Sequence, residues 1–191
     1  MLRNSIFKHG DYAEVVLTNG GKSVYIDIED LEKITPYNWS YSKLGYATSN
    51  IDKQHVFMHR YLMGLCKGDG KFVDHANGDG LDNRKSNLRV CTKTQNQQNQ
   101  RPTHTARSKY KGVGYYVRDK KWRARIVVDK KDIELGKFSC EMCAAIAYDE
   151  AAKKYHGEFA WVNRDHFPEI NDDSHPLRDV NFEHGDAKRV V

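Results

Sequence analysis

The sequence predicts an α+β fold assembled from short sheets and a few helices. Three observations favour it: loose apolar alternation between residues 12 and 28, a strand-turn-strand-helix pattern within residues 72–101, and clean alternation over residues 121–128 ahead of an alanine-rich helical segment. From these patterns we expect five segments. They are a β-rich module (1–57), a strand-strand-helix unit (58–101), a linker (102–109), a three-stranded antiparallel sheet packed on one helix (110–163) and an acidic tail (164–191).

The N-terminal module is predicted to be structural. Its first two strands flank an Asn-Gly-Gly sequence at residues 19–21, which is typical of a hairpin turn. A helical turn over residues 29–34 should end before Pro36, because the residue that precedes a proline avoids helical geometry. Trp39 is the natural core residue of this module, and we expect no chemistry from residues 1–57.

The strand-strand-helix unit is preceded by a short predicted helix over residues 58–65. Its hairpin starts at residue 72, turns through a stretch rich in glycine, asparagine and aspartate, and returns over residues 88–91. Thr92 and Gln95 then fit a capping box, in which each side chain bonds to the other residue's backbone N–H group. A helix should therefore follow the hairpin directly.

Composition excludes the fibrous and membrane-spanning classes. The chain has 191 residues, of which 39% are hydrophobic and 30% charged, as in a soluble globular protein. No apolar run approaches the ~20 residues of a membrane span, and the N-terminus lacks the apolar core of a signal peptide. We expect the protein in a cytoplasm, with its four cysteines reduced.

Charge is concentrated in the middle of the chain. Residues 84–137 hold sixteen Lys and Arg against four Asp and Glu, whereas residues 1–58 hold six against seven and residues 165–191 three against seven. A basic span with aromatic residues among the cations is the electrostatic signature of nucleic-acid binding. We therefore favour a nucleic-acid partner over a merely solvated charged face.

Polar residues of the hairpin and the following helix could bring together a metal ion and a proton acceptor. Asp74 and Asn96 offer the oxygen ligands that hard divalent cations prefer. His75 offers a base whose pKa lies near neutrality. Because side chains alternate across a strand, Asp74 and His75 can serve one site only if the strand ends there.

The segment resembles the HNH (His-Asn-His) endonuclease motif, in the Asp-His…Asn…Asn form of phage-type and intron-encoded homing endonucleases. Asp74, His75, Asn87 and Asn96 carry the resemblance. It implies a ββα-metal unit in which His75 is the general base for hydrolysis of a DNA phosphodiester and Asp74 and Asn96 hold one Mg²⁺ (or Mn²⁺). Asn87 would hold the loop and orient the histidine. For His59, in the helix before the hairpin, the sequence leaves two roles open, structural support of the motif and contact with a phosphate. One such site per chain implies that a monomer nicks double-stranded DNA, in a bacteriophage or another mobile element.

The C-terminal unit is predicted to pair three strands and to cover them with one helix. The strands are expected over residues 110–118, 121–128 and 133–138. Ser139 is the predicted N-cap of a helix over residues 140–156, which ends at a glycine. Small residues of the helix permit close packing on the Trp122 face of the middle strand. The arginines of that strand should therefore point outward, on its other face.

This unit resembles the Apetala/ethylene-response-factor type of DNA-binding domain. The matching segments are Tyr-Lys-Gly-Val at 110–113, Lys-Trp-Arg-Ala-Arg-Ile at 121–126, Leu-Gly-Lys-Phe at 135–138, Ala-Tyr-Asp-Glu-Ala-Ala at 147–152 and Phe-Ala-Trp-Val-Asn at 159–163. That family lays its sheet in the major groove, which implies DNA contacts from the outer sheet face. The candidates are Tyr116, Arg118, Lys121, Arg123 and Arg125, together with Arg84 and Arg89 beside the nuclease motif. The plant pattern has an acidic residue at the position of Arg125, so the base readout is not implied.

Two other interpretations remain open at the level of sequence. A catalytically silent, sequence-specific DNA-binding protein or regulator fits the basic middle and the C-terminal unit equally well. A structural zinc protein would need Cys66 and Cys91 to join the Cys140-Glu-Met-Cys143 motif. Small thiols packed beside a helix are the more economical interpretation of these cysteines.

Overall fold

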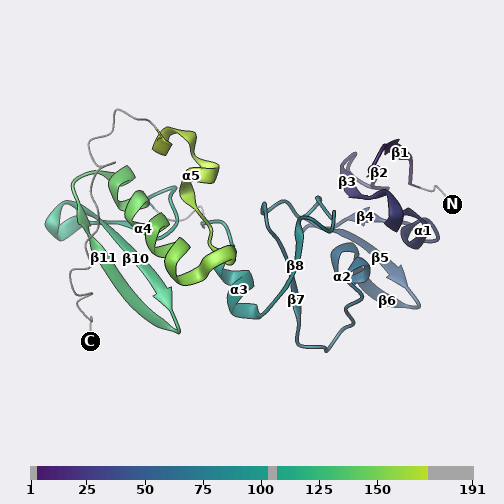
Figure 1. Ribbon diagram of the computed structural model, residues 1–191. Helices are drawn as coiled ribbons and strands as arrows, with labels where there is room; N and C mark the ends of the chain where they lie inside the picture. The colour runs from purple at the N-terminus through teal and green to yellow at the C-terminus, as the bar shows by residue number, and fades with distance from the viewer. Residues whose placement is uncertain (1–3, 103–106, 172–191) are drawn as a thin grey trace. The chain divides into compact units, whose positions relative to one another are not determined.

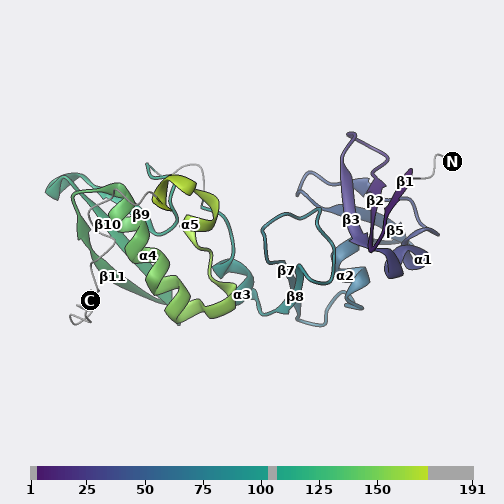
Figure 2. The same cartoon turned by 45° about the horizontal axis from the view of Figure 1, so that its top comes forward.

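The computed structural model describes residues 4–102 and 107–171 and divides the chain into two compact units, 1–97 and 98–191. Figures 1 and 2 show the same chain from two directions. Within the described residues, no helix is both long enough and apolar enough to cross a membrane. The predicted mixture of small antiparallel sheets and few helices is confirmed, and each unit builds its own core.

The first sheet of unit 1 has three antiparallel strands in the order β1-β2-β3. They are β1 (Ile6–His9), β2 (Tyr12–Val16) and β3 (Ser23–Asp27). The two predicted strands are β2 and β3, whose residues alternate between buried and partly buried. Strand β1 was not predicted, because an edge strand that leaves Phe7 53% exposed has no apolar alternation to reveal it.

A second three-stranded sheet and two short helices complete the core of unit 1. The elements are the 3-10 turn at Ile28–Asp30, α1 (Leu31–Ile34), β4 (Ser40–Tyr41), β5 (Ala47–Ile51), β6 (Gln54–Phe57) and α2 (Met58–Leu62). Trp39 is fully buried, as predicted, and its indole N–H donates to the Ile34 carbonyl at 3.0 Å. Met58 and Leu62 share this core with residues of the first sheet, so the β-rich module and α2 fold together.

The hairpin and helix of the nuclease motif follow in the predicted order. They are β7 (Phe72–His75), β8 (Leu88–Cys91) and α3 (Lys93–Gln98). The capping box is present, because the Thr92 hydroxyl accepts from the Gln95 N–H at 3.2 Å and the Gln95 carboxamide accepts from the Thr92 N–H at 2.8 Å. Helix α3 ends at Gln98, three residues before the predicted end at Arg101.

Unit 2 consists of a three-stranded antiparallel sheet covered on one face by a long helix (Figure 1). The strands are β9 (Val113–Tyr116), β10 (Lys121–Val128) and β11 (Lys131–Phe138), in the order β11-β10-β9, with a 3-10 turn at Val117–Asp119. Strand β9 is shorter than predicted because Gly112, just before it, has a φ of +76°, which an extended strand does not allow.

The long helix of unit 2 is α4 (Glu141–His156), and it ends at Gly157 as predicted. Its N-cap is Cys140 and not Ser139, since the Cys140 sulfur accepts from the Cys143 N–H at 3.5 Å. Ala144 and Ala152 are fully buried against the inner sheet face, where Ala124 also lies. The alternation of β10 is therefore confirmed, with its arginines on the opposite face.

The end of the described chain is more ordered than the sequence indicated. A 3-10 turn at Gly157–Phe159, helix α5 (Asn163–His166) and a 3-10 turn at Pro168–Asn171 follow α4. Ile170 is 3% exposed and belongs to the core of unit 2. The predicted acidic tail therefore does not begin at residue 164, because apolar side chains fix the residues up to 170. Residues 172–191 of that tail and residues 103–106 of the predicted linker lie outside the described residues.

Candidate active site

His75 is the last residue of β7, and Asp74 immediately precedes it. In the β7-β8 register Asp74 pairs with Arg89 and His75 pairs with Leu88. The side chains of Asp74 and Arg89 thus leave one face of the hairpin, and His75 leaves the other. Strand β7 ends at His75, but its register is regular through both residues, so the two side chains lie on opposite faces of the hairpin end. Both are buried, at 5% and 6% exposure.

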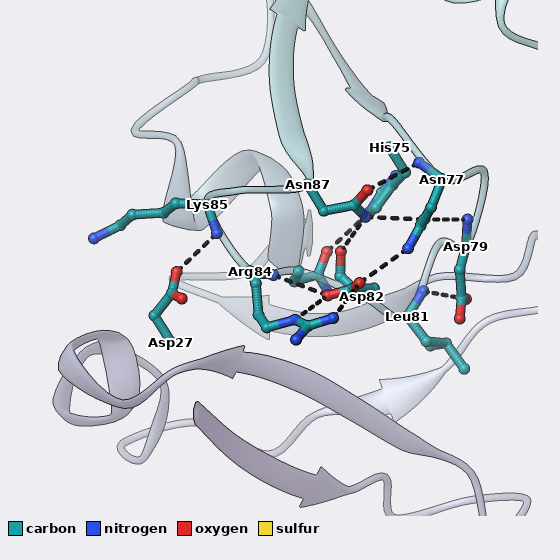
Figure 3. A network of polar contacts seen from close by, with 10 residues as sticks. Asp27, His75, Asn77, Asp79, Leu81, Asp82, Arg84, Lys85 and Asn87 are labelled. Carbon is teal, nitrogen blue, oxygen red and sulfur yellow. Dashed lines mark hydrogen bonds and ion pairs between the residues drawn. The ribbon is translucent and has the colours of Figure 1, made fainter. Parts of the chain in front are cut away.

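The loop between β7 and β8 is held by Asn87 (Figure 3). Its carboxamide oxygen accepts from the Asn77 N–H at 2.9 Å, and its Nδ2 donates to the Asn77 side chain at 3.0 Å and to the Asp82 carbonyl at 2.8 Å. These bonds tie the loop to the start of β8. They give Asn87 the loop-holding contacts that were predicted for it, but none of them reaches the imidazole of His75.

The direct partner of the histidine is Asn83, a residue that sequence reasoning missed. His75 Nε2 and Asn83 Oδ1 lie 3.0 Å apart, and Asn83 is completely buried. Nothing in the sequence marks it, because an Asp-Asn pair in a glycine-rich stretch indicates only a turn. The fold brings this asparagine to the base by folding the loop back on itself.

Residues of the N-terminal module position this loop. The Tyr25 carbonyl accepts from the Asn83 N–H at 2.7 Å, and the Tyr25 N–H donates to the Leu81 carbonyl at 2.8 Å. The Asp27 carboxylate accepts from the Lys85 N–H at 2.7 Å (Figure 3). Strand β3 therefore acts as a template for the loop, a role that its sequence did not reveal.

Aromatic rings enclose the other sides of His75. Tyr46 stacks on it with the ring centroids 5.7 Å apart, and His59 meets it edge-on at 5.1 Å. His59 is itself buried between Tyr46 and Phe57. Burial lowers the pKa of His59 to about 3, with a smaller contribution from the nearby His75. This histidine is neutral and packed among aromatic rings, which favours the structural one of its two expected roles.

Burial is also the largest influence on His75 and lowers its pKa below the ordinary value. The hydrogen bond to Asn83 and the carboxylates of Asp74, Asp79 and Asp82 act in the opposite direction. The imidazole is therefore neutral at physiological pH. A neutral imidazole can accept a proton, which a general base must do.

The opposite face of the hairpin carries Asp74. Asp74 forms an ion pair with Arg89, whose side chain is 19% exposed. The Cys91 thiol lies on the same face, and burial together with the Asp74 charge raises the pKa of that thiol to about 11. The Asn96 N–H donates to the Thr92 carbonyl at 3.0 Å, in the first turn of α3, which begins two residues after Cys91. Asp74 and Cys91 thus share one face of the hairpin, and the helix that carries Asn96 follows closely after Cys91 in the chain.

The predicted DNA contacts near the motif are already engaged with carboxylates. Arg84 forms a two-pronged ion pair with Asp82, at 2.7 Å through Nε and 2.8 Å through Nη2. This contact lowers the pKa of Asp82. Arg89 pairs with Asp74 as described above. Both guanidinium groups therefore also stabilise the site internally.

The outer face of the β9-β10-β11 sheet carries the other predicted DNA contacts. Arg123 faces Glu134 at 3.7 Å, and Arg125 faces Asp132 at 3.0 Å. Tyr116 lies beneath Arg123, with the guanidinium carbon 5.5 Å from the ring centroid. Lys121 pairs with Tyr116 in the sheet register, whereas Arg118 lies in the adjacent 3-10 turn. All five side chains are exposed or partly exposed.

Several residues of the second sequence motif have packing roles in unit 2. A Cβ atom on Gly112 would lie 1.9 Å from the Tyr148 ring. The Asp149 carboxylate accepts from the Asn163 backbone and side-chain amides at 2.7 and 2.9 Å. Asn163 in turn accepts from the Lys111 N–H at 2.8 Å. These contacts join the start of β9, helix α4 and helix α5.

The cysteines are distributed without a common centre in the described parts of the chain. Cys66 is exposed, Cys91 is buried in the hairpin, and Cys140 and Cys143 belong to the first turn of α4. No three His, Cys, Asp or Glu side chains lie close enough to hold a metal ion within residues 4–102 and 107–171. A site for Mg²⁺ would therefore need amide or carbonyl oxygens beside a carboxylate.

Comparison with known proteins agrees with the motif. Residues 52–98 match the family model of the HNH endonuclease. An uncharacterized HNH endonuclease of Acanthamoeba polyphaga mimivirus is 29% identical over 149 residues, which cover 75% of this chain and 76% of that protein. No solved structure matches the chain. Residues 52–98 thus form an HNH endonuclease domain, and the chain is an enzyme, a DNA endonuclease of the hydrolase class.

Proposed function

We propose that the HNH domain hydrolyses a DNA phosphodiester with His75 as the general base and with one divalent metal ion held by Asp74 and Asn96. The proposal rests on one observation: the residues that match the family model include the hairpin β7-β8 and helix α3, on which these side chains lie. Asn87 holds the loop between the two strands.

The donor set suits Mg²⁺ or Mn²⁺, because carboxylate and carboxamide oxygens are hard ligands. Asp74 and Cys91 share one face of the hairpin, and α3 begins two residues after Cys91, which supports donors on that face. When bound, such an ion offsets the charge that develops on the phosphate and on the leaving oxygen. Arg89 already compensates the Asp74 charge, so it would share that carboxylate with the ion.

The chain's own residues supply the remaining steps. His75, kept neutral by burial, accepts the proton of a water molecule as the water oxygen attacks phosphorus. Asn87 keeps the loop closed through its bonds to Asn77 and Asp82, so the base stays in place. Tyr46 and His59 restrict access of bulk water to the imidazole.

We further propose that unit 2 is an Apetala/ethylene-response-factor-like module that binds double-stranded DNA through its outer sheet face. Exposed cations and an aromatic ring on that face support this role. One catalytic centre per chain supports nicking by a monomer, and the order of the two modules supports a homing type of enzyme, as in phages and introns.

A plasmid assay tests the catalytic proposal. Supercoiled plasmid and purified protein are incubated with Mg²⁺ or with EDTA, and nicked and linear products are quantified. We expect nicked circles with Mg²⁺, none with EDTA, and none with His75→Ala. The control His9→Ala removes an exposed histidine of β1 and should nick like the wild type.

Two outcomes would contradict the proposal. Nicking by His75→Ala at the wild-type rate would remove this residue as the base. DNA binding without any nicking by the wild-type protein, with either Mg²⁺ or Mn²⁺, would favour the silent DNA-binding regulator instead. Linear product formed at the rate of nicking by a demonstrably monomeric protein would refute single-strand cleavage.

A further inference from the structure

The imidazole of His75 faces a carbonyl oxygen that is locked inside the unit. Asn83 Oδ1 lies 3.0 Å from His75 Nε2, and both side chains are buried. A carboxamide oxygen can only accept a hydrogen bond, so the facing ring nitrogen must carry the proton. The contact thus selects one of the two neutral tautomers of the base.

Asn83 is held in place independently of the histidine. Its backbone N–H donates to the Tyr25 carbonyl at 2.7 Å, and the preceding residue, Asp82, forms a parallel bridge with Tyr25. Asp82 is also fixed by its carboxylate, which accepts from Asn77 at 2.9 Å and pairs with Arg84. The acceptor therefore has a defined position before any substrate arrives.

The cost of burying this asparagine indicates that packing does not explain it. Asn83 is 0% exposed, and its Nδ2 group has no hydrogen-bond partner within the described residues. An unsatisfied buried donor costs about 1–3 kcal/mol of stability. A residue that lowers stability in this way is characteristic of functional sites.

We propose that Asn83 is a positioning residue that fixes His75 as the Nε2–H tautomer, so that Nδ1 is the atom that takes the proton from water. The inference rests on the proposed function of His75 as general base. In the step, a water O–H bond breaks, an Nδ1–H bond forms, and Nε2–H continues to donate to Asn83. The ring stays oriented by Tyr46 and His59 on its other sides.

The tautomer can be measured directly without DNA or metal. Long-range proton–nitrogen correlation spectra of protein labelled with ¹⁵N-histidine distinguish the two tautomers by their nitrogen shifts. The chain has nine histidines, so the His75 signals are assigned by their loss in His75→Ala. We expect pure Nε2–H tautomer in the full-length wild-type protein at pH 7.5. A pure Nδ1–H tautomer, or rapid exchange between the two, would overturn the proposal.

Variants separate positioning from folding. Asn83→Leu removes the acceptor and should produce mixed tautomers and a kcat that is about 10–100-fold lower, with KM for DNA unchanged. Asn83→Asp restores an acceptor and should recover both the Nε2–H tautomer and most of the rate. The control Asn4→Leu removes another bonded asparagine of unit 1, whose side chain donates to Val16 and Trp39, and should keep the wild-type tautomer.

The outcomes distinguish this inference from the proposed function. Pure Nε2–H tautomer in a folded Asn83→Leu would refute the role of Asn83 even if His75 is the base. If Asn83→Leu does not fold, two measurements still test the role of Asn83. They are the tautomer of His75 in the wild-type protein and the recovery of tautomer and rate in Asn83→Asp. Wild-type nicking by His75→Ala would refute the proposed base and leave the tautomer assignment standing.

Discussion

The two units of the chain place their polar side chains in opposite ways. Around His75, polar groups are buried and bond to one another through the loop between β7 and β8. On the outer sheet face of unit 2, cations are accessible and are paired with acids of the neighbouring strand. Catalysis requires reacting groups in fixed positions, whereas binding a polyanion requires accessible charge. The same difference determines which substitutions should damage folding, chemistry or binding.

The largest effect should come from a motif residue of unit 2 that has only a packing role. Gly112→Ala places a methyl group 1.9 Å from the Tyr148 ring at a backbone φ of +76°. We expect unit 2 to lose more than about 3 kcal/mol of stability, because both strain and overpacking act there. Hydrogen–deuterium exchange resolved along the chain would show faster exchange in β9, β10 and α4 and unchanged exchange in unit 1.

Gly114→Ala is the matched control for that substitution. It lies two residues further along, in β9, where an added Cβ atom meets nothing within 4 Å. Its exchange pattern should match the wild type. Equal protection losses in the two variants would show that the Gly112–Tyr148 contact does not limit packing.

Acid should destabilise unit 1 through its buried histidines. Folding lowers the pKa of His59 from 6.5 to about 3, so the unfolded chain binds that proton more tightly. Its contribution to stability is complete above pH 6.5 and is lost as the pH falls toward 3. His59→Phe should therefore remove about 2 kcal/mol of the stability change between pH 7.5 and pH 5. Urea unfolding of unit 1 at both pH values measures this difference.

The same replacement at an exposed histidine provides the comparison. His55→Phe changes a side chain of β6 that lies at the surface. It should leave the pH dependence of unfolding as it is in the wild type. If His59→Phe also left it unchanged, burial of His59 would not be the source of acid sensitivity.

A smaller effect is expected from the exposed cations of unit 2. Arg123→Ala and Arg125→Ala should each weaken DNA binding by about 1–2 kcal/mol. Each should also reduce the slope of log affinity against log salt concentration by about one, because one phosphate contact is lost. Their effect on stability should stay below about 1 kcal/mol, because exposed ion pairs contribute little. Binding titrations at several salt concentrations, with Mg²⁺ replaced by Ca²⁺ to suppress cleavage, measure these changes.

Lys153→Ala tests whether loss of a positive charge elsewhere in unit 2 weakens DNA binding to the same extent. Lys153 is an exposed residue of α4, the helix that covers the opposite face of the sheet. Its replacement should change affinity by less than half as much as Arg123→Ala. Similar losses in all three variants would show that net charge, and not the outer sheet face, governs binding.

The smallest effect should come from the capping box at the start of α3. Thr92→Ala removes the hydroxyl that accepts from the Gln95 N–H and should cost about 1 kcal/mol. Thr94→Ala, at the second residue of the same helix, should change stability by less than about 0.5 kcal/mol. Urea unfolding compares the two, and an equal cost would show that the cap does not stabilise α3.

Local signals in the sequence were sufficient for most of the elements. The capping box at Thr92 and the alternation of β10 each depend on residues that are close together in the chain, and both are present. The N-cap of α4 was misplaced by one residue, because a serine is a stronger general signal than the cysteine that caps this helix. Edge strand β1 has no apolar alternation and could not be recognised.

The candidate site was only partly predictable because its geometry comes from distant segments. The motif residues Asp74, His75 and Asn87 could be chosen from their chemistry and spacing. Asn83 could not, since its approach to His75 depends on the backbone bond to Tyr25 in a strand 58 residues earlier. The packing of Tyr46 on His75 is likewise a product of the tertiary fold.

Binding of Mn²⁺ to the DNA-free protein tests the central claim most directly. Electron paramagnetic resonance should show one bound ion per wild-type chain, and Asp74→Ala and Asn96→Ala should each weaken that binding at least about 10-fold. Asp11→Asn, a control at an exposed carboxylate of unit 1, should bind like the wild type. Wild-type affinity in both Asp74→Ala and Asn96→Ala would contradict the account, because the two side chains would then not share an ion.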